Sequence, residues 1–347
     1  RPRGFIGAGV DEPNAQVQLY SGDKTEPNAI ATTVELVEGL VARSQNCWPS
    51  VSFDFGAINN FLSKFFPAGF YYKTFMWPRN FWYKIYEPII RRAAGLGIAP
   101  LKPDPDRYEH RFEHCDILIV GSGPSGLASA LSAAKNGARV ILAEDKPRFG
   151  GSLLTDEVTI GNKKGKEWAD ETITLLKSMP NVTIKNRSQV FGYYDHNMMV
   201  MIERTKDHLE KSNKFTPRQR LWYIRAKEVI ISTGSIERPL VFGNNDRPGI
   251  MLSSAAKEYI KVYGVAVGKK PIIFTNNDSG YDTAIEFKKN GIDPLILDVR
   301  LNSDSSVVKE AKNLNINIKF SHGIINALGY KKVKGALIGK LNSDKSG

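Results

Sequence analysis

Cysteine is almost absent from this chain of 347 residues, which contains only Cys47 and Cys115. The two lie far apart and form no CxxC pair, so the sequence predicts no structural zinc or iron–sulfur site and indicates a reducing compartment, which we take to be the cytoplasm. No apolar run approaches the roughly eighteen residues that span a bilayer, so no membrane-spanning segment is expected.

The chain also has few histidines and no recognisable start. Its histidines lie in no motif with a nucleophile or with metal-ligand spacing, so we expect no catalytic and no metal-binding residue; they are His110, His114, His196, His208 and His322. The N-terminus, residues 1–4, lacks an initiator Met and the pattern of a signal peptide, which indicates a fragment. The length predicts two or three domains.

The net charge is +12, and this raises the question of nucleic-acid binding. The lysines and arginines are scattered among acidic residues, with no long basic run and no known binding module, so we expect no nucleic-acid partner. A generally electropositive surface that suits anionic ligands or an acidic partner is the better interpretation.

Residues 116–144 carry the pattern on which the rest of the prediction depends. A short apolar run (116–120), a glycine-rich turn (121–126), a helical segment (127–136) and a second apolar run ending at Glu144 follow without gaps. This order is typical of a dinucleotide-binding βαβ unit, in which the pyrophosphate lies on the helix N-terminus. A lone GxGxxG could be a purely structural turn, but the flanking elements favour a dinucleotide.

Each residue of this pattern has an expected task. Gly121 lets the chain turn sharply off the strand, Gly123 leaves room for the pyrophosphate, and Gly126 lets the helix pack closely on the strand. Glu144 lies where a carboxylate would accept hydrogen bonds from the ribose hydroxyls. The alternative for Glu144 is a solvated strand end.

Two later turns are expected to reach the same cofactor. Gly150 and Gly151 follow the acid and let the backbone approach a bound nucleotide. Residues 227–235 read as a buried strand that returns to the first sheet and ends in Thr233 and Gly234, although an ordinary strand-to-loop turn is the alternative. The intervening elements are expected to be a helix at 166–178 and strands at 182–185, 188–194, 198–204 and 220–225.

A second βαβ pattern follows with a poorer turn. Its strands are expected at 270–275, 294–298 and 316–320, and its helix at 282–290. The connecting turn, 276–281, holds one glycine, and Asp278 and the Cβ atoms there would repel or crowd a pyrophosphate. This unit is therefore expected to keep the fold without tight dinucleotide binding.

The N-terminal part has a different character. Residues 17–20 and 31–37, joined through the turn 21–24, predict a β-hairpin in a small β-rich piece that is too short to fold alone. Half of the residues between 65 and 86 are aromatic. Pro67, Pro78 and Pro88 interrupt this stretch, so we expect no long helix there.

The aromatic stretch has two open interpretations. It could cover the dinucleotide-binding domain of the same chain, or it could form an arm buried against a partner subunit, where Trp, Tyr and Arg are favoured. A membrane-surface role is disfavoured because the prolines leave no clean amphipathic face. Residues 100–107 read as an extended linker.

These features resemble a known family. Two dinucleotide-type units, the first with a Gly-Gly pair after its acid and a returning strand ending in Thr-Gly, resemble the two-domain flavoprotein disulfide reductase fold. The stretches similar to the alpha subunit of heterotetrameric sarcosine oxidase are 1–4, 12–15, 39–46, 67–79, 91–97 and 275–279. The family's alpha subunit is much longer, beginning upstream of Arg1 and ending in an aminomethyltransferase-like folate domain.

The resemblance implies a function and a set of cofactors. The family oxidises sarcosine with oxygen to glycine and hydrogen peroxide and passes the one-carbon unit to tetrahydrofolate. Amine oxidation occurs at FAD in the beta subunit, FMN lies at the alpha–beta interface, and the alpha subunit holds a tightly bound NAD. Smaller subunits complete the heterotetramer. The chain would then be the NAD-holding portion that scaffolds the beta subunit.

The resemblance also implies a ferredoxin remnant at the N-terminus. Related alpha subunits carry a ferredoxin-like [2Fe–2S] domain in which cysteines follow a Gly-x-Gly-Val segment. Here residues 7–10 continue into Asp11 and Glu12, so no thiolate ligands exist to hold a cluster.

The expected fold class is α/β, with two Rossmann-like dinucleotide-binding domains of the flavoprotein disulfide reductase type. The expected domains are 1–40 (ferredoxin-like remnant), 41–110 (irregular aromatic arm and linker), 111–265 (first dinucleotide-binding domain) and 266–347 (second, degenerate domain). The expected cofactor-binding residues are Gly121, Gly123, Pro124, Ser125, Gly126, Glu144, Asp145, Gly150, Gly151, Ser152, Thr233 and Gly234.

Two other functions stay open. One is a subunit of a related multi-subunit amine, proline or opine dehydrogenase, in which the same site binds FAD or another adenine nucleotide. The other is a non-catalytic interaction module whose nucleotide only stabilises the fold.

Overall fold

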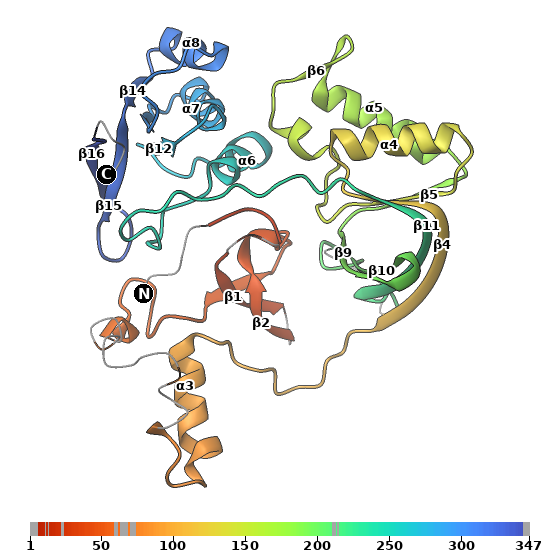
Figure 1. The fold of residues 1–347 in the computed structure, drawn as a ribbon. Helices are drawn as coiled ribbons and strands as arrows, with labels where there is room; N and C mark the ends of the chain where they lie inside the picture. Colours follow the sequence, from red (N-terminus) through yellow and green to blue (C-terminus); the bar gives the residue numbers. More distant parts are fainter. Residues whose placement is uncertain are drawn as a thin grey trace. The chain divides into compact units, whose positions relative to one another are not determined.

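The structure is a computed structural model that describes residues 6–10, 12, 14–21, 24–58, 62, 69, 74–209, 213 and 215–342. The chain divides into two compact units (Figure 1). One comprises Arg1–Asp104, Glu237–Ile260 and Ala266–Gly347, and the other Pro105–Ile236 with Lys261–Val265.

The unit around residues 105–236 is built on one mixed sheet. Its elements are β4 (Tyr108–Val120), α4 (Pro124–Lys135), β5 (Val140–Ala143), η5 (Gly151–Leu154), β6 (Thr159–Ile160), β7 (Lys163–Lys164), α5 (Gly165–Ser178), β8 (Val182–Lys185), β9 (Ser188–Tyr194), η6 (Asp195–Asn197), β10 (Met198–Arg204) and β11 (Gln219–Ile231). The six strands lie in the order β8-β5-β4-β11-β10-β9. The first four of these strands are mutually parallel, whereas β10 runs antiparallel to both of its neighbours.

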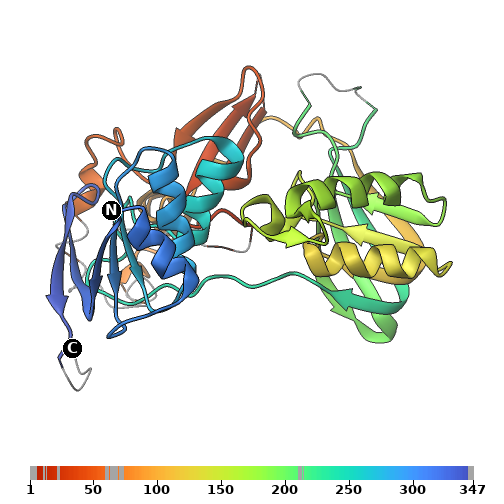
Figure 2. The same cartoon turned by 90° about the horizontal axis from the view of Figure 1, so that it is seen from above.

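Both faces of the parallel strands are covered. Figures 1 and 2 show α4 and α5 side by side over one face, where Leu127 and Leu176 pack with Ile119 of β4. On the other face, Met201 of β10 and the neighbouring apolar side chains of β10 and β11 pack against Leu118 and others. Two buried faces explain why 116–120 and 140–143 read as continuous apolar runs.

Three parallel strands end at one edge of this sheet. Val120 pairs in register with Ala143 of β5 and with Ile231 of β11. The turns that follow β4, β5 and β11 therefore meet at the carboxyl edge, which is where open α/β sheets bind their ligands.

Among the described residues, the other unit contains three smaller sheets. Its strands and helices are β1 (Gln16–Ser21), β2 (Lys24–Ile30), η1 (Ala31–Thr33), β3 (Val41–Ser44), η2 (Phe55–Ile58), η4 (Trp82–Tyr86), α3 (Glu87–Ala94), α6 (Ser253–Tyr263, whose last turn belongs to the first-described unit), β12 (Ile272–Thr275), α7 (Ser279–Lys289), β13 (Leu295–Asp298), α8 (Ser306–Asn313), β14 (Asn317–Phe320), β15 (His322–Leu328) and β16 (Gly335–Lys340). Their sheets have the orders β2-β1-β3, β12-β13-β14 and β15-β16.

The second βαβ pattern forms as expected. β12, β13 and β14 are parallel, and α7 and α8 pack on them through a buried core around Tyr281, Phe287 and Ile296. The α/β fold with two Rossmann-like βαβ units is thus confirmed, since a parallel strand–helix–strand order recurs in each.

Most element predictions are confirmed, three of them with identical bounds: 182–185, 188–194 and 198–204. The expected strands at 220–225 and 227–235 are in fact one strand, β11, which ends at Ile231. The prediction that its end is buried is wrong, because Ile231 is 63% exposed. Outward-facing apolar residues in this strand look buried when only the sequence is read.

The expected N-terminal hairpin has a different second strand. The strand is Lys24–Ile30, and Ala31–Thr33 form a 3-10 turn. This strand contains Pro27, and β2 lies at the edge of its sheet, where proline is tolerated. The backbone N–H of Thr32 donates to the side chain of Asn14, which favours the tight turn over an extended chain.

The prediction that Pro88 interrupts helical structure in the aromatic stretch is wrong. A π-helical turn over Trp82–Tyr86 runs directly into α3, where Pro88 sits in the first turn. The widened turn, in which the Glu87 N–H donates to the Trp82 carbonyl, gives the proline ring a place inside a continuous helical segment. Residues 63–68 and 70–73 of this stretch, and the ends 1–5 and 343–347, lie outside the described residues.

No helix in the described part of the chain is long and apolar enough to cross a membrane.

Candidate functional site

The turn between β4 and α4 depends on two glycines that touch backbone. Gly121 has a φ of +97°, and a Cβ there would lie 2.4 Å from the carbonyl oxygen of Ser232, just after β11. A Cβ on Gly126 would lie 1.9 Å from the carbonyl oxygen of Gly121. Any side chain at either position would force α4, β4 and β11 apart, so these glycines set the shape of the turn.

Gly123 has the opposite environment. A Cβ at this position would meet no atom within 4 Å, so the space in front of its backbone is open. Pro124 begins α4, and Ser125 is exposed in its first turn. The first N–H groups of a helix have no partner within the helix, so α4 presents donors and the positive end of its dipole at this open space.

The second glycine turn closes against the first. Gly150 and Gly151 both have positive φ angles, +121° and +54°. The Gly150 N–H donates to the Ser122 carbonyl at 3.1 Å. A Cβ on Gly151 would lie 2.8 Å from the Cα of Gly123, so the two turns touch through bare backbone. Together they form a backbone cradle at the edge of the sheet, which is the environment a pyrophosphate requires.

Glu144 lies directly beneath this cradle and is only 6% exposed. Its Oε2 accepts hydrogen bonds from the backbone N–H and the hydroxyl of Ser122, and its Oε1 accepts one from the backbone N–H of Lys146 at 3.0 Å. Burial, with a further contribution from neighbouring Asp145, raises the pKa of Glu144 to about 7, against the lowering effect of Ser122. The interpretation as a solvated strand end is therefore wrong.

Ser122 is the residue that reasoning from sequence missed. It is fully buried and contacts both Glu144 and Gly150 through its side chain and backbone. The available signal was a small hydroxyl residue between two glycines of the turn, twenty-two residues before the acid.

The remaining predicted residues lie around the cradle with less definite roles. The backbone of Thr233 packs beside Gly121, and Gly234 has a φ of +72° with open space around it. The Asp145 carbonyl accepts a hydrogen bond from Arg204, while Ser152 is exposed on η5. The structure thus brings together Gly121, Gly123, Gly126, Glu144, Gly150, Gly151 and Thr233, and leaves Ser125, Ser152 and Gly234 at the rim.

The set fits an adenine dinucleotide. The cradle offers backbone donors without side chains in the way, and Glu144 offers an acceptor for a ribose diol at the end of the second strand. Among the described residues, no group of three or more His, Cys, Asp or Glu side chains is arranged to hold a metal ion.

A separate cleft of about 650 Å³ lies on the outer side of α5 and is lined by none of the predicted residues. Its lining is Pro147, Arg148, Phe149, Leu154, Lys166, Asp170, Ile173, Thr174, Lys177, Asn186, Lys261 and Val262. Unlike the glycine cradle, this cleft is lined by charged side chains of both signs, among them Lys166, Asp170 and Lys177.

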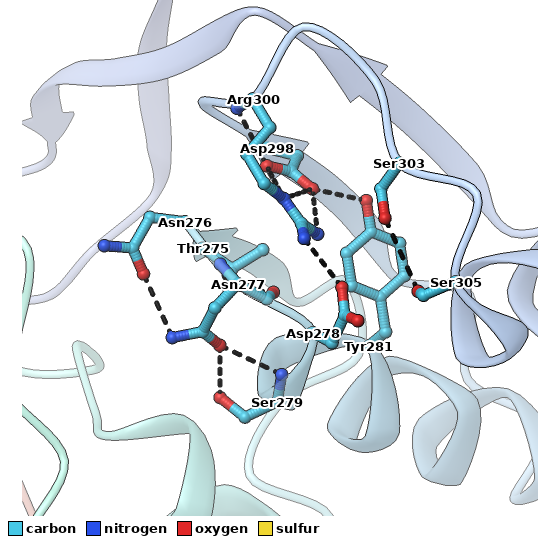
Figure 3. Close-up of polar contacts among 10 residues, drawn as sticks. All are labelled: Thr275, Asn276, Asn277, Asp278, Ser279, Tyr281, Asp298, Arg300, Ser303 and Ser305. Carbon is cyan, nitrogen blue, oxygen red and sulfur yellow. Dashed lines mark hydrogen bonds and ion pairs between the residues drawn. The ribbon is translucent and has the colours of Figure 1, made fainter.

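The corresponding turn of the second βαβ unit is filled by its own side chains (Figure 3). Asn277 accepts hydrogen bonds from the backbone N–H and the hydroxyl of Ser279, and Asp278 forms an ion pair with Arg300 at 2.7 Å. A Cβ on the one glycine, Gly280, would lie 2.8 Å from Thr275. Side chains stand where a pyrophosphate would have to lie.

The acid at the end of the second strand is also bonded to side chains of its own unit. Asp298 is completely buried and accepts hydrogen bonds from Tyr281 at 2.7 Å and from Arg300, whose Nη2 is 2.8 Å away. Arg300 thus lies between Asp298 and Asp278, as Figure 3 shows. This guanidinium lowers the pKa of Asp278 and keeps both carboxylates paired without any ligand.

Comparisons with known proteins agree with this geometry. A family model described as FAD dependent oxidoreductase matches residues 116–212, a range that begins at β4 and includes the cradle and Glu144. The sarcosine oxidase subunit alpha of Rhizobium meliloti (strain 1021) is 52% identical over 293 residues, which are 84% of this chain and 30% of that protein. The subunit of the same name from Corynebacterium sp. (strain P-1) is 33% identical over 92% of this chain and 28% of its own length.

The chain therefore spans less than a third of the length of these curated relatives. Among solved structures, the L-proline dehydrogenase from P. horikoshii shares 21% identity and a TM-score of 0.47, covering 68% of this chain and 40% of that one.

The elevated pKa of Glu144 predicts a pH-dependent stability. The folded carboxyl keeps its proton up to about pH 7, whereas the unfolded one loses it near its ordinary value of 4.5. The folded state then binds more protons in this window, so the free energy of unfolding should fall as the pH rises, by about 3 kcal/mol. Glu144→Gln should remove this component.

Urea unfolding of both proteins between about pH 4.5 and pH 7.5 measures the difference. The exposed Glu228→Gln on β11 is the matched control and should keep the wild-type slope. The same pH dependence in wild type and in Glu144→Gln would contradict the assignment.

The Arg300 cluster predicts a large loss of stability when its cation is removed. Arg300→Ala should cost about 3 kcal/mol or more, because it leaves the carboxylate of Asp298 buried without its charged partner. Adding Asp298→Asn should recover part of the loss, since it removes the orphan charge. Thermal unfolding checks both, with the exposed Arg238→Ala as the control; equal stability of Arg300→Ala and Arg238→Ala would show that the cluster is not structural.

Proposed function

This chain is a homologue of the sarcosine oxidase alpha subunits over 84% of its length, and from that premise we propose that it is the nucleotide-holding portion of such a subunit. In this proposal it binds NAD at the cradle after β4 and scaffolds a flavin-bearing beta subunit. The complete assembly converts sarcosine, oxygen and tetrahydrofolate to glycine, methylenetetrahydrofolate and hydrogen peroxide. It works in the cytoplasm as a heterotetramer.

The observation that carries the proposal is the open space at Gly123. Around it, Gly121, Gly126 and Gly151 are packed against backbone, whereas a Cβ on Gly123 would meet nothing within 4 Å. Packing alone explains glycine at the first three positions but not at Gly123. A ligand that must lie close to the backbone does explain it.

The residues of the cradle divide the work of holding a dinucleotide. The N-terminus of α4 would bind the pyrophosphate, Gly150 and Gly151 would let it approach, and Glu144 would accept hydrogen bonds from the adenosine ribose. When bound, the nicotinamide or flavin ring supplies a hydride acceptor or donor. Thr233 and Gly234 would border the nucleotide at the end of β11.

We place the amine chemistry outside this chain. Of the histidines, His322 is held by the carbonyl of Phe320 at 2.6 Å, and His110 stacks on Tyr223, so both have structural contacts. The proposal therefore assigns no catalytic residue here. It assigns amine oxidation to FAD in the beta subunit, and it places FMN at the alpha–beta interface and the folate chemistry in other parts of the assembly.

Two alternatives share the same site. A subunit of a related amine, proline or opine dehydrogenase would hold FAD, which the family model covering residues 116–212 favours by its description. A non-catalytic interaction module would hold a structural nucleotide or none. The nucleotide released from the purified chain by denaturation, identified by mass, separates the three: NAD supports the proposal, FAD supports the first alternative, and a folded protein without nucleotide supports the second.

Gly123→Val tests the cradle directly. The valine side chain fits the free chain but occupies the place of the pyrophosphate. We therefore expect an unchanged melting temperature when both proteins are nucleotide-free, and at least a tenfold loss of retained nucleotide, equivalent to about 1.4 kcal/mol. Gly268→Val, a glycine with equally open surroundings in the other unit, is the matched control. Retention of nucleotide at the wild-type level in Gly123→Val would sink the assignment.

The helical segment from Phe81 to Ala94, with the residues just before it, is our candidate for contact with the partner subunit. Tyr86 organises it from within: its ring lies 5.1 Å from that of Phe75, and its hydroxyl donates to the Trp77 carbonyl at 3.0 Å. Yet Trp77 and Tyr83 are each 83% exposed in this chain. The exposed apolar side chains of the segment are Met76, Trp77, Phe81, Tyr83, Ile85 and Ile89.

The charges around these residues indicate the chemistry of the partner. Arg79, Lys84 and Arg92 are exposed beside them, and Glu87 is already paired with Arg91 at 2.7 Å. Aromatic residues surrounded by arginine are typical of subunit interfaces. This helical segment therefore suits a partner surface that is apolar at its centre and acidic at its edge.

Trp77→Ala with Tyr83→Ala should weaken assembly with the partner subunit without unfolding the chain, because both rings are exposed. We expect at least a tenfold rise in the dissociation constant for the co-expressed beta subunit, since interface aromatics contribute about 1.4 kcal/mol or more together. Phe191→Ala with Tyr330→Ala, two aromatic residues that are also more than half exposed, is the control. Equal co-elution of both double variants would leave the arm without an interface role.

A further inference from the structure

Ser122 joins three separate segments of the cradle. Its backbone N–H donates to Glu144 Oε2 at 2.9 Å, and its hydroxyl donates to the same oxygen. The Gly150 N–H lies 3.3 Å from the Ser122 hydroxyl oxygen and 3.1 Å from the Ser122 carbonyl. A single buried residue therefore connects the first glycine turn, the acid after β5 and the second glycine turn.

These bonds divide the two oxygens of the Glu144 carboxylate. Oε2 receives both donors of Ser122, whereas Oε1 receives the Lys146 N–H, and the side chain of Asp145 also forms a hydrogen bond with this carboxyl group. A carboxylate oxygen can accept two hydrogen bonds, so Ser122 fills Oε2 and a ribose hydroxyl would have to approach Oε1. Two donors from Ser122 hold Oε2 in place. They oppose rotation of the carboxylate and so fix the direction in which Oε1 points.

We propose that Ser122 is a positioning residue that fixes Glu144 to recognise the free 2′ and 3′ hydroxyls of an adenosine ribose bound at the cradle. The proposal rests on the nucleotide-binding function proposed above and adds the device that sets its selectivity. Ser122 touches no ligand itself, since it is completely buried. Without its hydroxyl, Glu144 keeps one donor on Oε2 and gains rotational freedom, so the ribose hydroxyls are recognised less well.

The test compares two probes that differ in one hydroxyl. ADP contains the adenosine ribose and the two phosphates common to NAD and FAD, and 2′-deoxy-ADP lacks one hydroxyl of the diol. After removal of retained nucleotide, we expect the wild-type chain to bind ADP about tenfold more tightly than 2′-deoxy-ADP, the value for one hydrogen bond to a charged group. In Ser122→Ala this preference should fall to about threefold or less, because the bond is weakened by lost positioning.

Controls separate positioning from general damage. Ser132→Ala, an exposed serine on α4, should keep the wild-type preference. Glu144→Gln should lose the preference on its own, and adding Ser122→Ala to it should change the preference no further. If Ser122→Ala does not fold, Ser122→Cys, which keeps a weaker donor, should give an intermediate preference.

Two failures are distinguishable. Wild-type protein that binds neither ADP, NAD nor FAD would overturn the proposed function and the inference with it. Wild-type protein that binds ADP with the expected preference, together with a Ser122→Ala or Ser122→Cys variant that keeps the full preference, would overturn only the role of Ser122. A loss of ADP and 2′-deoxy-ADP affinity by the same factor would also overturn it, since that is what a merely structural role predicts.

Discussion

The first dinucleotide-type unit depends on backbone touching backbone at the carboxyl edge of its sheet. Gly121 lies against Ser232, Gly126 against Gly121, and Gly151 against Gly123, each at a distance that excludes a Cβ. These contacts bring the ends of β4 and β11, the start of α4 and the turn after β5 to one point. The fold and the candidate site therefore have the same origin, because the contacts that close the fold surround an open position at Gly123.

Placing an acid beneath this cradle has an electrostatic cost. Glu144 is surrounded by buried apolar strands and has no cation among the contacts that set its pKa, so burial raises that pKa to about 7. Ser122 and the Lys146 N–H donate hydrogen bonds that partly replace the hydration the carboxylate loses on burial. A carboxyl group whose pKa is raised to near 7 at a candidate ligand site is more typical of a functional position than of a stabilising one.

The sequence predicts local structure well here because the local signals agree with the tertiary environment. The strands at 182–185, 188–194 and 198–204 are short apolar runs between turn residues, and the glycine turn follows from spacing alone. The prediction errors occur at positions where tertiary contacts determine the local structure. Pro27 is allowed because β2 is an edge strand, and Pro88 because a π-turn precedes it. Ser122 was missed because its role exists only once Glu144 and Gly150 are folded beside it.

The two βαβ units share one backbone arrangement but differ in the partners of the acid that follows the second strand. Both place an acid at the end of the second strand, Glu144 in one and Asp298 in the other. Asp298 has Arg300 and Tyr281 as internal partners, so its unit is complete without a ligand. Glu144 has hydrogen-bond donors but no cation, and its turn has a bare glycine instead of Asn277 and Asp278. A guanidinium supplied by the chain therefore pairs with the acid in the second unit, whereas the contacts that set the pKa of Glu144 include no cation. The two units therefore share a fold and differ in these few side chains, which is the physical basis for proposing a ligand at the first unit alone.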